Sequence, residues 1–186
     1  MRILLTSLSL LACSGAMAND TAWLAEARGV ASAMPPKLLQ VLTDEIAKGG
    51  PESAIGACSV EAPKMARAAS QQTGWNIRRV SLRQRNAAAV PDAWERAALE
   101  EFDRRAAAGE SAATLEKAET VTQGGRSEAR YMKALPTGPL CLQCHGPSEA
   151  LSAPVRAQLR ERYPADQATG YAAGQIRGAI SLRKPQ

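Results

Sequence analysis

The sequence predicts an α+β fold in which helices come first and a mixed stretch with four strands follows. In the first third of the chain, apolar residues recur at the spacing of amphipathic helices. Later stretches alternate apolar and polar residues as half-buried strands do, and Gly124-Gly125 separates two of them as a hairpin turn would. No internal repeat or low-complexity linker interrupts the 186 residues, which suits one domain.

Three helices are expected at the start. Residues 21–34 carry one apolar side, and Pro35-Pro36 should end that helix and open a second. The second helix should end at Gly49-Gly50, and Pro51 should begin a third that runs to about Thr73. The apolar stripe of the third helix is Ile55, Cys58, Ala62, Met65 and Ala69.

The rest of the chain should alternate strands and helices. A strand is expected from Trp75 to Leu82, then a helix from Pro91 to Ala108 with Pro91 in its first turn and no strong capping residue before it. Ser148 should cap a last helix that ends near Tyr163. The remaining strands should cover residues 116–122, 126–135 and 176–182.

The N-terminus is typical of a secretory signal. Met1-Arg2 gives a short positive start, an apolar run too short for a bilayer follows, and Ala16-Met17-Ala18 offers a cleavage site. Residues 1–18 are therefore expected to be removed, which leaves residues 19–186 as an exported, periplasmic domain with no membrane span. A lipid anchor on Cys13 is disfavoured because Leu11 is bulky for such a signal. The formal charge of +5 comes from dispersed basic residues, so no nucleic-acid binding is expected.

The most informative motif is Cys141-Leu-Gln-Cys144-His145. C-x-x-C-H is the attachment motif of c-type haem: the two thiols form thioethers with one porphyrin, and the histidine binds the iron from the proximal side. His145 is the only histidine of the chain and lies where this chemistry needs it. The sequence therefore predicts one covalent haem c on Cys141 and Cys144, with His145 as a ligand of the iron.

The second axial ligand of the iron is less determined. A second histidine is impossible, which leaves Cys58, Met34, Met65, Met132, a lysine, water or an empty position. Cys58 is the cysteine left over once the signal is removed and two thiols bind haem, yet a buried cysteine on a helix stripe is equally a small core residue. Met65 lies on the same stripe, about 10.5 Å further along at 1.5 Å per residue, so only one of the two can lie over the iron.

The three cysteines and His145 also add up to the donors of a structural zinc site. The adjacent Cys144 and His145 would strain a tetrahedral site, so zinc is disfavoured. A redox disulfide is disfavoured as well, because no βαβ pattern surrounds the motif.

Several stretches together resemble a family of exported c-haem domains with a PAS-like fold, long known as a domain of unknown function. Its members occur as stand-alone cytochromes and as sensor portions of histidine kinases and chemoreceptors. The resemblance covers most of residues 50–183. The matching stretches are Ala54-Ile55-Gly56-Ala57-Cys58 to Ala62-Pro63, Arg79-Val80-Ser81-Leu82-Arg83 with Arg85-Asn86, Pro91-Asp92-Ala93-Trp94-Glu95, Cys141 to Gly146, Tyr163-Pro164-Ala165-Asp166 through Gly170-Tyr171, and Gly174-Gln175-Ile176-Arg177-Gly178-Ala179-Ile180-Ser181.

This resemblance implies His/Cys ligation, with His145 proximal and Cys58 distal, and a PAS-like antiparallel sheet that forms one wall of the haem pocket. Guanidinium groups match the geometry of haem propionates, and Arg79 and Arg85 are the preferred partners because they lie in a matched segment. The other arginines considered are Arg78, Arg83 and Arg177.

Three functions remain open from the sequence. A redox or gas sensor would use a thiolate ligand that leaves on reduction or when NO or CO binds, and would need a membrane-bound signalling partner. A low-potential electron carrier would need a redox partner protein, and a thiolate ligand holds the potential low. An enzyme of sulfur-compound oxidation is less favoured because such enzymes usually hold a second haem, and the chain has one C-x-x-C-H.

Overall fold

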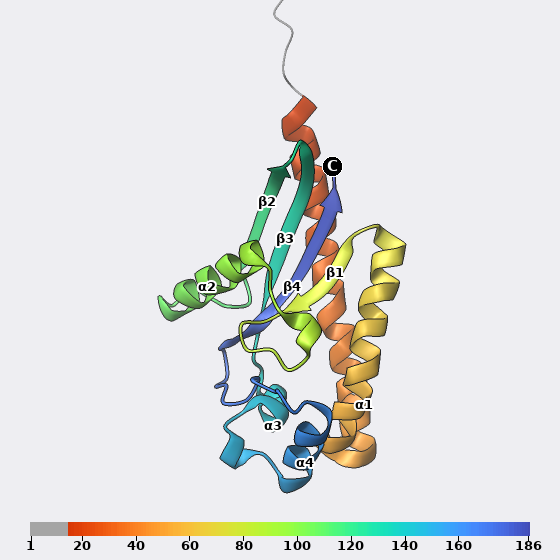
Figure 1. The fold of residues 1–186 in the computed structure, drawn as a ribbon, viewed down its shortest axis with the longest axis vertical. Helices are drawn as coiled ribbons and strands as arrows, with labels where there is room; N and C mark the ends of the chain where they lie inside the picture. The colour runs from red at the N-terminus through yellow and green to blue at the C-terminus, as the bar shows by residue number, and fades with distance from the viewer. Residues whose placement is uncertain (1–14) are drawn as a thin grey trace, which may run out of the picture.

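The computed structural model describes residues 15–186, with side chains from residue 22 onward, and it confirms the α+β fold. The centre is a four-stranded antiparallel sheet with the strand order β1-β4-β3-β2. Helix α1 covers one face of the sheet, α2 lies on the other, and α3 and α4 lie together beyond one end of the sheet (Figure 1). The elements are α1 (Gly15–Thr73), β1 (Asn76–Val80), α2 (Ala93–Ala107), β2 (Glu116–Gln123), β3 (Arg126–Pro136), α3 (Leu142–His145), α4 (Ala153–Arg162) and β4 (Ile176–Pro185), with short 3-10 turns at Ala87–Ala89, Pro139–Cys141 and Ser148–Ala150.

Helix α1 consists of two arms that meet at Gly49-Gly50, as predicted. Gly50 has φ 78° and ψ 175°, a conformation that favours glycine, and the backbone of Gly49 is also non-helical. The second arm returns beside the first and leads into β1 (Figure 1). Along the described residues no helix is long and apolar enough to cross a membrane. The predicted signal segment, residues 1–18, lies outside the described residues except for its last four, which belong to α1.

Pro35 and Pro36 do not end a helix, and that prediction is wrong. The first arm continues through both residues, although each proline removes one main-chain hydrogen bond to the carbonyl four residues earlier. Tertiary packing explains the difference. Trp23, Ala27 and Ala31 are buried against the sheet just before the prolines, and this burial outweighs the local cost.

One face of the sheet packs against α1. Ile77 of β1 and Tyr131 of β3 both lie opposite Leu182 of β4, so these three buried side chains form a row across the sheet. Side chains alternate along a strand, and Arg79, two residues after Ile77, therefore shares this face. Arg79 is exposed, so its guanidinium lies at the edge of the face that α1 covers.

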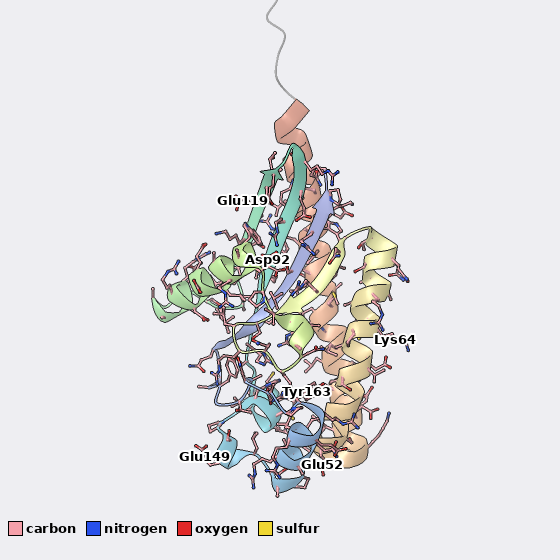
Figure 2. The ribbon with its side chains drawn as sticks, in the orientation of Figure 1. Glu52, Lys64, Asp92, Glu119, Glu149 and Tyr163 are labelled. Carbon is pink, nitrogen blue, oxygen red and sulfur yellow. The ribbon has the colours of Figure 1, made fainter. Side chains whose placement is uncertain are left out.

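The opposite face of the sheet packs against α2, where Leu99 and Phe102 are buried together with Met132. The prediction that no strong cap precedes this helix is wrong. Asp92 is the N-cap, and it forms a capping box with Glu95: the Glu95 N–H donates to Asp92, and the Asp92 N–H donates to the Glu95 carboxylate. Figure 2 shows Asp92 beside the sheet, where Arg130 of β3 binds its carboxylate.

The four predicted strands are all present, with shifted ends, and the Gly124-Gly125 hairpin joins β2 to β3. The cap of the last helix differs from the prediction. Ser148 begins a 3-10 turn, and Ser152 caps α4 by accepting a hydrogen bond from the N–H of Val155. Helix α4 packs against the second arm of α1 through the small buried cluster of Ile55, Leu151, Val155 and Leu159.

Candidate haem site

The C-x-x-C-H motif lies between β3 and α4, on a 3-10 turn that passes directly into α3. Cys141 and Cys144 are half-buried free thiols, not a disulfide. The Cys144 Sγ lies 4.0 Å from the carbonyl of Pro51, so the motif faces the start of the second arm of α1. Both thiols are therefore available for thioether formation.

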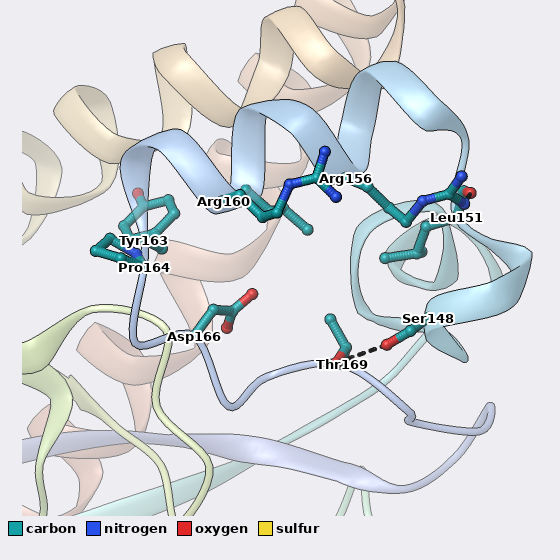
Figure 3. A pocket seen from close by; sticks show the side chains of 9 residues that line it. Ser148, Leu151, Arg156, Arg160, Tyr163, Pro164, Asp166 and Thr169 are labelled. Atoms are coloured by element: carbon teal, nitrogen blue, oxygen red, sulfur yellow. Dashed lines mark hydrogen bonds between the residues drawn. The ribbon is translucent and has the colours of Figure 1, made fainter.

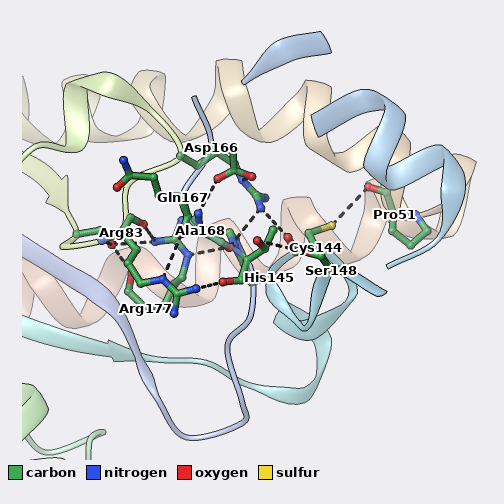
Figure 4. Close-up of polar contacts among 12 residues, drawn as sticks. Pro51, Arg83, Cys144, His145, Ser148, Asp166, Gln167, Ala168 and Arg177 are labelled. Carbon is green, nitrogen blue, oxygen red and sulfur yellow. Dashed lines mark hydrogen bonds and ion pairs between the residues drawn. The ribbon is translucent and has the colours of Figure 1, made fainter. Parts of the chain in front are cut away.

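The ring of His145 is oriented by a main-chain contact. Its Nδ1 lies 2.7 Å from the carbonyl oxygen of Ala168 (Figure 4). A carbonyl only accepts, so this contact requires a proton on Nδ1 and leaves the lone pair on Nε2. Metal-binding histidines are held in the same way, by a hydrogen bond from the nitrogen that does not bind the metal.

The loop of residues 163–171 is hydrogen-bonded to the motif through its last residues. The N–H groups of Gly170 and Tyr171 donate to the carbonyls of Gly146 and His145 at 2.7 and 2.9 Å. Within the motif itself, a Cβ at Gly146 would lie 2.6 Å from the carbonyl of Leu142, so the turn that ends α3 requires glycine. We refer to residues 163–171 as the proximal loop.

Arg177 is the positive charge closest to His145. Its Nε lies 3.1 Å from Nδ1 (Figure 4), but a guanidinium only donates, so this contact and the shorter one to the Ala168 carbonyl cannot both be hydrogen bonds of Nδ1. We assign the proton to Nδ1 from the shorter contact. The Arg177 Nη1 donates to the hydroxyl of Ser81. Desolvation lowers the pKa of His145 well below its usual value, and the charges of Arg177 and Arg85 lower it further. The imidazole is therefore neutral at pH 7, which is the form that binds iron.

Arg85 and Arg83 hold the proximal loop in place. Arg85 donates to the Asp166 carboxylate at 3.0 Å and to the Cys144 carbonyl at 2.6 Å. Arg83 donates to the carbonyls of Gln167 and Thr169 and lies 4.3 Å above the ring of Tyr171. Arg85 thus already has partners, and its predicted contact with a propionate stays a prediction.

Cys58 lies on the second arm of α1 and is a half-buried free thiol. Burial raises its pKa, while the positive charge of Arg79 lowers it. Burial likewise raises the pKa of Cys144, whose thiol is also influenced by the charge on Cys58. The structure therefore brings the third cysteine into electrostatic range of the motif.

Arg79 lies among these groups. It is accessible to solvent, but protein surrounds it closely enough that desolvation lowers its pKa, and Cys141 and Cys58 are among the groups that act on it. Arg79 forms no hydrogen bond or ion pair within the described part of the chain, which suits a guanidinium that awaits a carboxylate. Arg78 faces the other side of the sheet, where it donates to the carbonyls of Ala88 and Val90.

The three methionines considered as the second axial ligand lie in different parts of the fold. Met132 is fully buried between the sheet and α2, and Met34 packs against the core between the sheet and α1. Met65 is half-buried on the second arm of α1, two stripe positions beyond Cys58. Among the side chains of residues 22–186, no three of the types His, Cys, Asp and Glu lie close enough together to hold a metal ion.

A family model covers almost the whole chain and matches residues 12–185. The chain belongs to the Tll0287-like family. The crystal structure of the cyanobacterial heme-protein Tll0287 is similar to it, with 28% sequence identity, a TM-score of 0.56, and coverage of 69% of this chain and 71% of that chain. No curated protein matches the chain.

The donor set of this Tll0287-like chain fits a c-type haem. It contains two free thiols at the right spacing, a neutral histidine with an oriented ring, a third thiol nearby and an unpaired guanidinium. Sequence reasoning missed Ala168, whose carbonyl orients the histidine, and Asp166, which accepts a hydrogen bond from the Ala168 N–H. Both lie in a segment that resembles the family, but a main-chain carbonyl leaves no signal in a sequence.

Proposed function

We propose that this protein is an exported c-type cytochrome with one covalent haem, ligated by His145 and Cys58. The observation that carries the proposal is the contact of His145 Nδ1 with the Ala168 carbonyl, because it leaves the lone pair of Nε2 free to bind iron. This histidine directly follows a segment with two free thiols. The similarity to the heme-protein Tll0287, 28% identical to this chain, supports the haem binding in this proposal. When bound, the haem supplies one-electron redox chemistry and an iron that can take small ligands.

Different residues of the chain would anchor the haem, orient its ligand and bind its propionates. Cys141 and Cys144 would anchor the porphyrin, and the Ala168 carbonyl would hold the proximal ring at a fixed angle. Arg79, and with a change of partner Arg85, would bind the propionates. The Cys58 thiol, whose pKa burial raises, would depend on the ferric iron to lose its proton and would be the weaker of the two ligands in the ferrous state.

We infer a role in redox or gas sensing from this ligand set, because a thiolate that leaves on reduction opens a position for CO or NO. The output would pass to a membrane-bound signalling partner in the periplasm. Low-potential electron transfer is the alternative. It is favoured by the half-exposed motif, where Gln143 is open to solvent, because a redox partner protein could approach the haem edge there.

The ligand proposal is tested with the intact haem protein and the variant Cys58→Ser, with Met65→Leu from the same helix stripe as the matched control. Both variants should keep one haem by mass, because the thioethers remain. Cys58→Ser should lose the thiolate features of the ferric spectrum, and Met65→Leu should keep them. An unchanged spectrum in Cys58→Ser removes Cys58 from the iron.

The role is tested by exposing the reduced protein to CO and to NO. A sensor should bind at least one gas with exchange of the distal ligand. If the reduced protein binds neither gas and keeps one fixed ligand set, the sensing role is wrong. Rapid electron exchange with a partner cytochrome would then support the carrier.

A further inference from the structure

The proximal loop has a second side that faces α4. Between the loop and α4 lies a hollow of about 450 Å³, with Arg156 and Arg160 on the helix and Asp166 and Thr169 on the loop (Figure 3). Ser148, three residues after His145, closes one side and lies 3.3 Å from the hydroxyl of Thr169. A hollow of this size is typical of small-molecule sites.

The hollow has two positive charges that no carboxylate compensates. Arg160 has no hydrogen bond or ion pair to any side chain of residues 22–186, and Arg156 donates only to the carbonyl of Leu151. Asp166 is the one acidic residue of the lining, and groups outside the lining compensate its negative charge. Arg85 donates to Oδ2 at 3.0 Å, and the N–H of Ala168 donates to Oδ1 at 2.8 Å. The lining is thus positive overall.

The side chains that line the hollow indicate which kind of ligand fits it. Two guanidinium groups one helical turn apart suit a carboxylate or phosphate head, and the hydroxyls of Ser148 and Thr169 can donate to it. Tyr163, which is half-buried, and Pro164, which is exposed, also line the hollow and offer an apolar surface beside the charges. An inorganic ion would leave that surface uncovered.

We propose that this hollow binds a small organic anion, with its charged head on Arg156 and Arg160 and its apolar body on Tyr163 and Pro164, and that the proximal loop transmits the binding to the haem motif. The second half of this inference rests on the proposed function.

The connection runs through contacts on the opposite side of the same loop. Asp166 holds Arg85, and Arg85 donates to the carbonyl of Cys144 at 2.6 Å. One residue before Thr169, the carbonyl of Ala168 orients His145. An added negative charge here would favour ferric over ferrous iron, so the anion should bind the ferric protein more tightly, and by linkage should lower the potential by the same free energy.

The test uses the haem protein and three probes, benzoate, hexanoate and phenyl phosphate, titrated by calorimetry in the ferric and ferrous states. Two further compounds are controls: benzamide has the apolar body without the negative charge, and inorganic phosphate has the negative charge without the apolar body. Arg160→Gln removes an arginine of the hollow. Arg162→Gln is the matched control, because it makes the same change on the same helix where the side chain approaches Gly56 of α1 instead.

At least one probe should bind the wild-type protein and the Arg162→Gln variant equally, and Arg160→Gln should weaken it about tenfold, the loss of one charged hydrogen-bonding group. Binding to the ferrous protein should be about threefold weaker, which corresponds to a potential about 28 mV lower at 59 mV per tenfold change.

The site is overturned if none of the three probes binds, if benzamide or inorganic phosphate binds as well as they do, or if Arg160→Gln binds like Arg162→Gln. Equal affinity in the two redox states overturns the transmission to the haem. Failure of the proposed function is seen separately, as a protein without covalent haem, and calorimetry with the probes does not depend on it.

Discussion

The two ends of the molecule are built by different means. The sheet half, which comprises the sheet, α2 and the first arm of α1, contains two buried clusters of nine residues each. The motif half, which comprises residues 137–175 and the second arm of α1 against them, has one buried cluster of four. Its segments are joined instead by arginines that donate to main-chain carbonyls, such as Arg85 to Cys144 and Arg83 to Gln167.

This difference indicates that the sheet half can fold on its own apolar core, whereas the motif half needs an apolar insert to complete its core. Burial of apolar surface is the dominant stabilising contribution in a small domain, and four buried side chains provide little of it. The haem that we propose for this half would supply the missing surface. The arginines then fix the geometry around the haem and do not replace the core.

The largest effect is expected in the sheet half, from Leu99→Ala. Leu99 is 2% exposed between α2 and the sheet, and its neighbours are fixed on both sides. The lost burial and the remaining cavity should lower the free energy of unfolding by about 3–4 kcal/mol. Urea unfolding of the haem protein, followed by far-UV circular dichroism, measures this. A loss below about 1 kcal/mol would contradict a tightly packed sheet half.

The same substitution in the motif half, Leu159→Ala, makes the comparison direct. Leu159 is 5% exposed, but it belongs to the small cluster at the surface of α4, which can relax around the gap. We expect a smaller loss of about 2 kcal/mol, at the low end for this substitution. Hydrogen exchange should rise in residues 153–171 and stay unchanged in β3 and β4. An equal rise across the sheet would show that the two halves unfold as one unit.

The two halves also differ in how far their structure could be predicted from the sequence. In the sheet half, the strands and α2 follow from alternation and helical spacing, and the Gly124-Gly125 turn joins β2 to β3 as expected. Two predictions for this half were wrong. A helix end was expected at Pro35-Pro36, where packing of distant residues keeps the helix intact. No strong cap was expected before α2, but Asp92 is the cap, and Glu95 three residues later completes the capping box. Local patterns describe this half because its contacts repeat regularly.

In the motif half, the sequence identified the chemistry but not the geometry. The C-x-x-C-H motif identifies the two thiols and His145. Cys58 is the cysteine left over once the signal segment is removed and two thiols bind haem. The orientation of the histidine depends on the carbonyl of Ala168, a residue whose side chain carries no chemistry. The hollow beside α4 could not be foreseen either, because it exists only where α4, which carries Arg160, lies opposite the proximal loop, which carries Thr169.

The smallest expected effect concerns the Asp92 cap, which tests whether the stability of the sheet half is mainly apolar. Burial would raise the pKa of Asp92, but the hydrogen bond from the Glu95 N–H and the charge of Arg130 outweigh it and lower the pKa. The contribution of this carboxylate is therefore present above its unfolded pKa of about 3.9 and is lost as the pH falls through the lower folded value.

Asp92→Ala should lower the free energy of unfolding by about 1 kcal/mol at pH 7, the usual effect of a lost N-cap. Asp92→Asn keeps a capping side chain but loses the charge opposite Arg130, so it should lose less. As the pH is lowered below about 4, the wild-type protein should approach both variants, because the carboxylate itself becomes protonated. Urea unfolding of the three proteins at pH 7 and pH 3 measures the difference. If the loss in Asp92→Ala were as large as in Leu99→Ala, polar capping and not apolar burial would determine the stability of the sheet half, and the contrast with the motif half would no longer hold.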